Sequence, residues 1–199
     1  MKPRSPPRNF AAIRKSGSSI LLGFNEPDKT DQADMTVDQA IALWPRLQDT
    51  GLRLGSPAPG KSPAQDGSWL ARFMAEAEAR HYRVDFICVH WYGDITAPDA
   101  VEQLRAFLEA VHYRYRRPVW LTEFSGSNGP WLKLKTPVTL EDNAAFLRQA
   151  LPMLESLPYL ERYAWFELKF KTAPWDQVAL INPDTREFTV AGRAYLLNE

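Results

Sequence analysis

Two glutamates in this sequence occupy positions from which a pair of side chains could perform acid–base chemistry. Glu26 in the segment GFNEPD follows an apolar run at residues 20–24, and Glu123 in WLTEFS follows another at residues 119–122. Each glutamate is therefore expected where a buried strand ends and its loop begins. Two carboxylates that face each other across a cleft suit glycoside hydrolysis, because one protonates the leaving oxygen while the other attacks the sugar or activates water.

The separation of the two glutamates fits a unit that repeats along the chain. Short apolar runs without polar alternation predict buried strands at residues 20–24, 52–55, 86–90, 119–122 and 163–166. The first four runs are followed, at intervals of 30, 34 and 33 residues, by the polar side chains Glu26, Ser56, His90 and Glu123. Glu26 is therefore expected three strands before Glu123, on the opposite side of a barrel mouth.

Amphipathic helices are predicted between these strands. Thr36 and Gln39 have the spacing of a capping box, and Pro45 is expected to shorten or kink the helix that follows. The expected helix starts lie at or just after Thr36, Ser68, Asp99 and Thr139. Short buried strands that alternate with amphipathic helices predict βαβ units and a parallel sheet.

A (β/α)8 barrel of the TIM type is the architecture that this pattern favours. Units of about 32 residues with polar residues at each strand's carboxyl end are typical of that barrel. A doubly wound parallel sheet is the alternative, although no glycine-rich phosphate loop follows any predicted strand. A closed barrel usually takes about 250 residues, whereas this chain of 199 contains about five βα units. We therefore expect an incomplete barrel over residues 20–199, preceded by a leader and short helix at residues 1–19.

Composition excludes several other classes of protein. Lysine plus arginine equals aspartate plus glutamate at 24 each, so a nucleic-acid partner is not expected. No stretch approaches 18 consecutive apolar residues, which argues against a membrane-spanning helix. Cys88 is the single cysteine, and the three histidines show no metal-ligand spacing, so neither a metal nor another cofactor is expected. The first eight residues, MKPRSPPR, lack the features of a secretory signal.

Tryptophans near the predicted strand ends suggest a surface on which sugar rings could stack. Trp91, Trp131, Trp165 and Trp175 lie in or beside these loops. Core packing is the alternative for any tryptophan, and it fits Trp44, Trp69 and Trp120, which lie in predicted helices or inside a strand. Among the histidines, His90 alone ends a strand and is the candidate for a functional role.

A wider set of segments carries a resemblance to a known family. The pair formed by Asn-Glu-Pro and a second glutamate three strands later looks like the signature of the clan A retaining glycoside hydrolases. The segments GFNEPD, MTVDQAIALWP, GLRLGSPA, RVDFICVHWYG, RPVWLTEFS and ERYAWF together resemble the Asl1-like catalytic domain of glycoside hydrolase family 128, which contains β-1,3-glucanases. The resemblance runs from about residue 20 to residue 197, and about three strands of the family's domain have no counterpart before it.

The resemblance implies a role for each residue of the candidate site. Glu26 would be the general acid/base and Glu123 the nucleophile of a double displacement, with carboxyl groups about 5–5.5 Å apart. His90 and Tyr92 would line the site, and Tyr92 would hydrogen-bond Glu123 and hold it ionised. The remaining implied substrate contacts are Asn25 at the sugar 2-hydroxyl, Trp165 as the floor under the cleaved sugar, and Trp91 and Trp131 as further binding residues.

Three functions stay open on the sequence alone. The first is a retaining endo-1,3-β-glucosidase that acts on polymeric β-glucan, which the resemblance would place outside the cell. The second is an inactive glucan-binding remnant, and the third is a fragment of a longer hydrolase. Both carboxylates are intact, which favours the enzyme, because a binding module needs neither.

Overall fold

The computed structural model describes residues 13, 17–129, 132, 134, 137–169 and 176–197. The chain forms two compact units, Met1–Cys88 and Val89–Glu199. Of the leader and short helix expected at residues 1–19, all but residues 13 and 17–19 lies outside the described residues. Among the residues that are described, none of the helices combines the length and the apolar character needed to cross a membrane.

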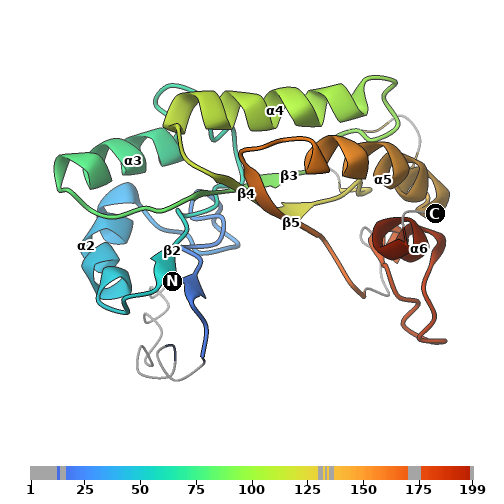
Figure 1. The fold of residues 1–199 in the computed structure, drawn as a ribbon, viewed down its shortest axis with the longest axis horizontal. Helices are drawn as coiled ribbons and strands as arrows, with labels where there is room; N and C mark the ends of the chain where they lie inside the picture. Colours follow the sequence, from blue (N-terminus) through green and yellow to red (C-terminus); the bar gives the residue numbers. More distant parts are fainter. Residues whose placement is uncertain are drawn as a thin grey trace. The chain divides into compact units, whose positions relative to one another are not determined.

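Over its described residues, the first unit contains the parallel strands β1 and β2 and the helices α2 and α3 (Figure 1). Strand β1 (Ile20–Leu21) pairs with β2 (Arg53–Leu54), with Ile20 opposite Arg53. Helices α2 (Val37–Gln48) and α3 (Trp69–Ala79) follow these strands and contact each other. The predicted order of strand and helix is therefore confirmed for this unit.

Local signals in the sequence set the starts of both helices. Thr36 caps α2 through the predicted capping box, in which its hydroxyl accepts from the Gln39 N–H and the Gln39 side chain accepts from the Thr36 N–H. Ser68 caps α3 by accepting from the N–H of Ala71. Pro45 lies inside α2, which continues past it to Gln48, so of the two expected effects the helix does not show an end at Pro45.

Aromatic rings form the centre of the first unit. Phe73 is fully buried, with its ring 4.9 Å from that of Trp44 and 5.6 Å from that of Trp69. Nε1 of Trp44 donates to the carbonyl of Arg83 at 2.9 Å, and Nε1 of Trp69 donates to the carbonyl of Met35 at 2.8 Å. The core-packing alternative is therefore confirmed for both tryptophans.

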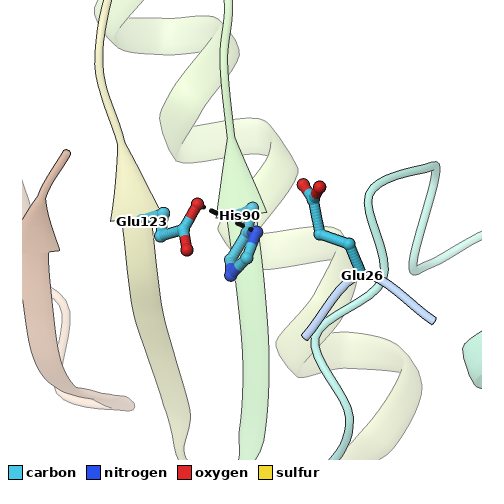
Figure 2. Close-up of side chains that lie close together, drawn as sticks. All are labelled: Glu26, His90 and Glu123. Carbon is cyan, nitrogen blue, oxygen red and sulfur yellow. Dashed lines mark ion pairs between the residues drawn. The ribbon is translucent and has the colours of Figure 1, made fainter. Parts of the chain in front are cut away.

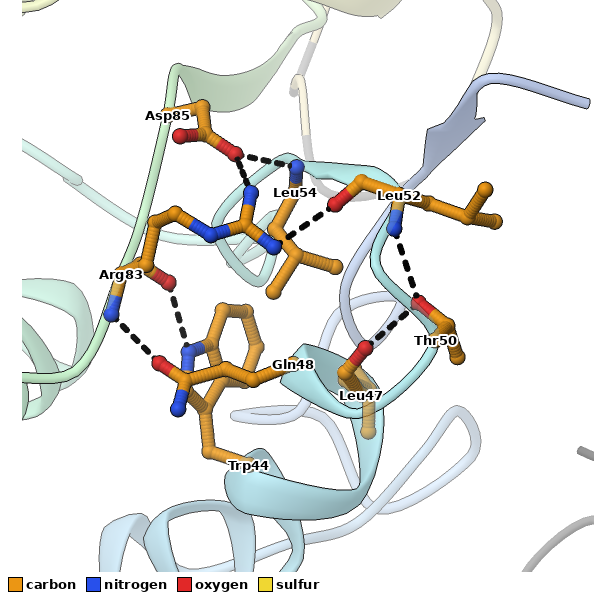
Figure 3. Close-up of polar contacts among 8 residues, drawn as sticks. All are labelled: Trp44, Leu47, Gln48, Thr50, Leu52, Leu54, Arg83 and Asp85. Carbon is orange, nitrogen blue, oxygen red and sulfur yellow. Dashed lines mark hydrogen bonds and ion pairs between the residues drawn. The ribbon is translucent and has the colours of Figure 1, made fainter.

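A polar network ties the start of β2 to the segment that leads into the next strand (Figure 3). Arg83 donates to the carbonyl of Leu52 at 2.8 Å and forms an ion pair with Asp85. Asp85 in turn accepts from the N–H of Leu54 at 2.6 Å. These contacts fix the register of β2, after which the loop with Ser56 begins.

The second unit is built on a three-stranded sheet in the order β3–β4–β5. Strand β3 is Ile87–Trp91, β4 is Val119–Phe124 and β5 is Leu160–Trp165. Strands β4 and β5 are parallel, and Phe124 lies opposite Trp165 at their carboxyl ends. All five predicted strands are thus present, and the α/β class with parallel strands is confirmed.

Helices α4 (Ala100–Tyr115), α5 (Leu140–Glu155) and α6 (Val190–Leu197) complete the second unit, with a 3-10 turn at Asp176–Val178. Helix α5 contacts both α4 and α6. Thr139 begins α5 with a second capping box, in which it pairs with Asp142. The starts of α4 and α5 agree with the sequence, whereas α6 and the 3-10 turn were not predicted.

Candidate active site

Glu26 ends the extended segment that begins with β1. The preceding residue, Asn25, forms a parallel bridge with Ala58, and the N–H of Glu26 donates to the carbonyl of Ala58 at 2.8 Å. Glu26 has a φ of +38°, in the left-handed region where a residue with a side chain is strained. Its side chain is buried, and both of its carboxylate oxygens lie 2.9 Å from Nζ of Lys29.

Lys29 is held in place by the loop that follows β2. A Cβ atom at Gly60 would lie 2.3 Å from Cε of Lys29, so glycine leaves the room that the lysine side chain occupies. The N–H of Gly60 donates to Oδ1 of Asp28 at 2.7 Å, which joins the loops that follow β1 and β2. Lys29 was not singled out from the sequence, although a cation three residues after a candidate glutamate was a signal for it.

Asn25 is exposed beside Glu26, as a residue that contacts a sugar hydroxyl needs to be. Its Nδ2 donates to Oε1 of Gln32 at 3.2 Å, which orients the amide. The structure thus brings Asn25, Glu26 and Lys29 together at the carboxyl end of β1.

Glu123 lies near the end of β4, next to two side chains from β3 and the loop after it. The hydroxyl of Tyr92 donates to Oε2 of Glu123 at 2.5 Å. Nδ1 of His90 lies 3.3 Å from the same oxygen, and Figure 2 shows this ion pair. His90 is buried, whereas the Glu123 side chain keeps 25% of its surface exposed. The predicted hydrogen bond from Tyr92 is confirmed, and one carboxylate oxygen stays oriented by two neighbours while the group remains reachable.

The side chain of Trp91 lies apart from those of Glu123 and His90. Successive side chains of a strand point to opposite faces, so Trp91 faces away from the side that His90 presents to Glu123. Its ring stacks on Phe146 of α5 at 5.7 Å with an interplanar angle of 10°, and the residue is buried. The expected role of Trp91 in sugar binding is therefore corrected to packing between β3 and α5.

Trp165 ends β5, beside the residue that follows Glu123. Its ring meets that of Phe124 edge to face at 5.0 Å, and its Nε1 donates to the carbonyl of Val178 at 2.8 Å. The residue is buried and lies opposite Phe124, the neighbour of Glu123 in β4, so its ring packs on the face of the sheet away from the Glu123 side chain. The expected role of Trp165 as the floor under the cleaved sugar is therefore corrected to packing within the second unit. Trp131 and Trp175, the other tryptophans considered for sugar stacking, lie outside the described residues.

Comparison with known proteins shows the family to which the chain belongs. A family model described as the glycosyl hydrolase catalytic core matches residues 2–195. The alkali-sensitive linkage protein 1 of Schizosaccharomyces pombe is 34% identical over 160 residues, which are 76% of this chain and 27% of that protein. The chain therefore spans about a quarter of the length of this curated relative.

Solved structures of one glycoside hydrolase family are similar over nearly the whole chain. A GH128 subgroup I endo-β-1,3-glucanase from Amycolatopsis mediterranei, in complex with laminaritriose, is 40% identical with a TM-score of 0.86, and the match covers 98% of this chain and 78% of that one. A GH128 subgroup II endo-β-1,3-glucanase from Sorangium cellulosum is 30% identical with a TM-score of 0.77, over 96% and 75% of the two chains. The chain belongs to glycoside hydrolase family 128, within the glycosyl hydrolase catalytic core family.

Proposed function

We propose that this chain hydrolyses β-1,3-glucan with retention of configuration, as an endo-acting glycoside hydrolase that meets its polymeric substrate outside the cell. One observation carries the proposal: Glu123 is oriented by Tyr92 and His90 at a strand end, as a nucleophilic carboxylate must be. A relative that is 40% identical over 98% of this chain is an endo-β-1,3-glucanase with laminaritriose bound. The fold that we propose is a TIM-type barrel with about five of its eight βα units.

The proposed reaction is a double displacement between two carboxyl groups. In the first step Glu26 gives its proton to the glycosidic oxygen, the carboxylate of Glu123 attacks C1, and the bond from C1 to the leaving oxygen breaks. In the second step Glu26 takes a proton from water, the water oxygen attacks C1, and the ester bond to Glu123 breaks. This chemistry requires a carboxyl separation of about 5–5.5 Å, which is our prediction for the substrate complex.

The other residues of the site would bind and orient the sugar. Asn25 would donate to the 2-hydroxyl, where hydrogen bonds strengthen in the transition state. Trp131 is proposed as a further stacking residue by its place in the sequence.

Hydrolysis of laminarin by the purified chain tests the function. We expect release of reducing ends and of β-1,3-linked oligosaccharides, because the relatives from Amycolatopsis mediterranei and Sorangium cellulosum, which are 40% and 30% identical, are endo-β-1,3-glucanases. Carboxymethylcellulose, a β-1,4-glucan, serves as the control substrate and is expected to stay intact. Reducing-sugar assays and chromatography of the products measure hydrolysis of laminarin and of carboxymethylcellulose. Binding of laminarin without cleavage would contradict the proposal and would identify a glucan-binding remnant.

Tyr92→Phe removes one hydroxyl from the site and leaves the ring in place. A hydrogen bond to a charged group is worth about 1.5–3 kcal/mol, so we expect kcat on laminarin to fall roughly tenfold to 100-fold. The reason is that Glu123 loses a donor that orients its attacking carboxylate. Steady-state kinetics at several laminarin concentrations separate this effect from a change in KM.

The chain offers a matched control for this variant. Tyr163 also donates its hydroxyl to a carboxylate, that of Glu155, and burial and this hydrogen bond raise the pKa of the Tyr163 phenol. Tyr163→Phe therefore removes the same kind of contact elsewhere in the same unit. Equal kcat values for Tyr92→Phe and Tyr163→Phe would show that the hydroxyl on Glu123 does not serve the reaction.

A further inference from the structure

A fully buried amide lies in the first turn of α5. Asn143 has no exposed surface, and a buried polar group is costly unless its hydrogen-bonding atoms have partners. Its Oδ1 accepts from the N–H of Gly126 at 3.1 Å. Its Nδ2 lies within hydrogen-bond distance of the carbonyls of Gly126, Thr139 and Gln177, at 3.2, 3.2 and 2.9 Å. The amide therefore joins backbone segments from three parts of the second unit.

The first of these segments follows β4. Gly126 comes three residues after Glu123, and its N–H and its carbonyl both bond to the Asn143 side chain, in the manner of a strand pair. A Cβ atom at Gly126 would lie 2.3 Å from the Ile95 side chain and 3.0 Å from Oδ1 of Asn143. The chain is thus held tightly at the point where it leaves the strand that carries the nucleophile.

The second segment lies in the 3-10 turn at Asp176–Val178. Nδ2 of Asn143 donates to the carbonyl of Gln177, and the carbonyl of the next residue, Val178, accepts from Nε1 of Trp165. The position of the Trp165 ring therefore depends on the same turn that Asn143 holds. Through these contacts one amide fixes the surroundings of both Glu123 and Trp165.

We propose that Asn143 is a positioning residue for the hydrolysis reaction. It acts through Gly126 and the 3-10 turn to hold the carboxyl ends of β4 and β5 in place, and so sets the position of the Glu123 carboxylate. A misplacement of about 1 Å by a change away from the chemistry can cost about 100-fold in rate. The inference rests on the proposed function, because it assigns Asn143 a part in that reaction, and it adds a residue that touches neither substrate nor the reacting atoms.

Asn143→Ala tests the proposal, with Trp44→Phe as the control. Trp44 is a buried residue of the first unit whose Nε1 donates to a backbone carbonyl, so Trp44→Phe also removes a buried hydrogen bond. Thermal unfolding of each variant sets an assay temperature at which both are folded. We expect kcat on laminarihexaose to fall about tenfold to 100-fold in Asn143→Ala and to stay within about twofold of the parent in Trp44→Phe.

A second variant changes the contact between Gly126 and Asn143 at the glycine. It tests the role of Asn143 if Asn143→Ala does not fold. Gly126→Ala combined with Ile95→Ala relieves the clash with Ile95 and leaves the new methyl group against Oδ1 of Asn143. We expect the double variant to lower kcat more than Ile95→Ala alone does. If the parent is active and the folded Asn143→Ala or double variant has the same kcat as its reference, the proposed role of Asn143 is wrong. The proposed function is not affected by that result. A parent that does not cleave laminarihexaose overturns both.

Discussion

Glu123→Gln is expected to lower kcat on β-1,3-glucan by about 10⁴-fold or more. The amide has the shape of the carboxylate but cannot attack C1, so no covalent glycosyl-enzyme forms. The side chain keeps its place because the amide carbonyl can still accept from the hydroxyl of Tyr92. Binding should therefore survive, and calorimetric titration with laminarihexaose measures it on the same sample.

Glu109→Gln is the matched control for this variant. Glu109 is an exposed residue of α4, so the change removes a carboxylate of the same size away from the strand ends. A 2-deoxy-2-fluoro glucoside with a good leaving group should label the parent on Glu123, which peptide mass spectrometry detects. Labelling of another carboxylate, or a Glu123→Gln variant with more than about a tenth of parental kcat, would contradict the nucleophile assignment.

Glu26→Ala is expected to show a loss that depends on the leaving group. General acid catalysis contributes about 10²–10⁴-fold, so hydrolysis of β-1,3-glucan should fall by that factor. A dinitrophenyl β-laminaribioside needs little protonation of its leaving oxygen, so formation of its glycosyl-enzyme should be nearly unaffected. Stopped-flow measurement of the dinitrophenolate burst separates this step from the slower hydrolysis of the intermediate.

Sodium azide provides a second test of the same residue. Azide attacks the glycosyl-enzyme without help from a base, so it should restore turnover in Glu26→Ala and yield a β-glycosyl azide. Azide should not restore turnover in Glu123→Gln, because this variant forms no glycosyl-enzyme. Glu123→Gln is therefore the control. An equal loss on glucan and on the dinitrophenyl substrate, without rescue by azide, would show that Glu26 is not the acid/base.

The strands and most helix starts could be predicted because local signals and tertiary packing agree there. Thr36 and Thr139 start their helices with the capping boxes that their neighbours in sequence provide. Helix α6 could not be found in this way, because it is short and contains Gly192, which disfavours a helix. A Cβ atom at Gly192 would lie 1.9 Å from the carbonyl oxygen of Leu180, so close packing against this segment requires the glycine.

The sequence predicted those residues of the candidate site that lie at the ends of strands. His90, Tyr92 and Glu123 meet in the structure because polar residues that follow neighbouring strands share one edge of the sheet. Trp91 was predicted to bind sugar but packs on Phe146, although the alternation of side chains along β3 was the signal that separates it from His90. Lys29 was missed although its place three residues after Glu26 was a local signal for the ion pair. Asn143 depends on contacts with segments distant in sequence, which no local pattern encodes.

The stereochemistry of the first product tests the central claim most directly. Proton NMR during the early minutes of laminarihexaose hydrolysis distinguishes the anomeric protons of new reducing ends before mutarotation mixes them. Double displacement through Glu123 predicts that the β-anomer appears first and that the α-anomer grows in later. Initial formation of the α-anomer would show that water attacks C1 directly and would contradict a nucleophilic role for Glu123.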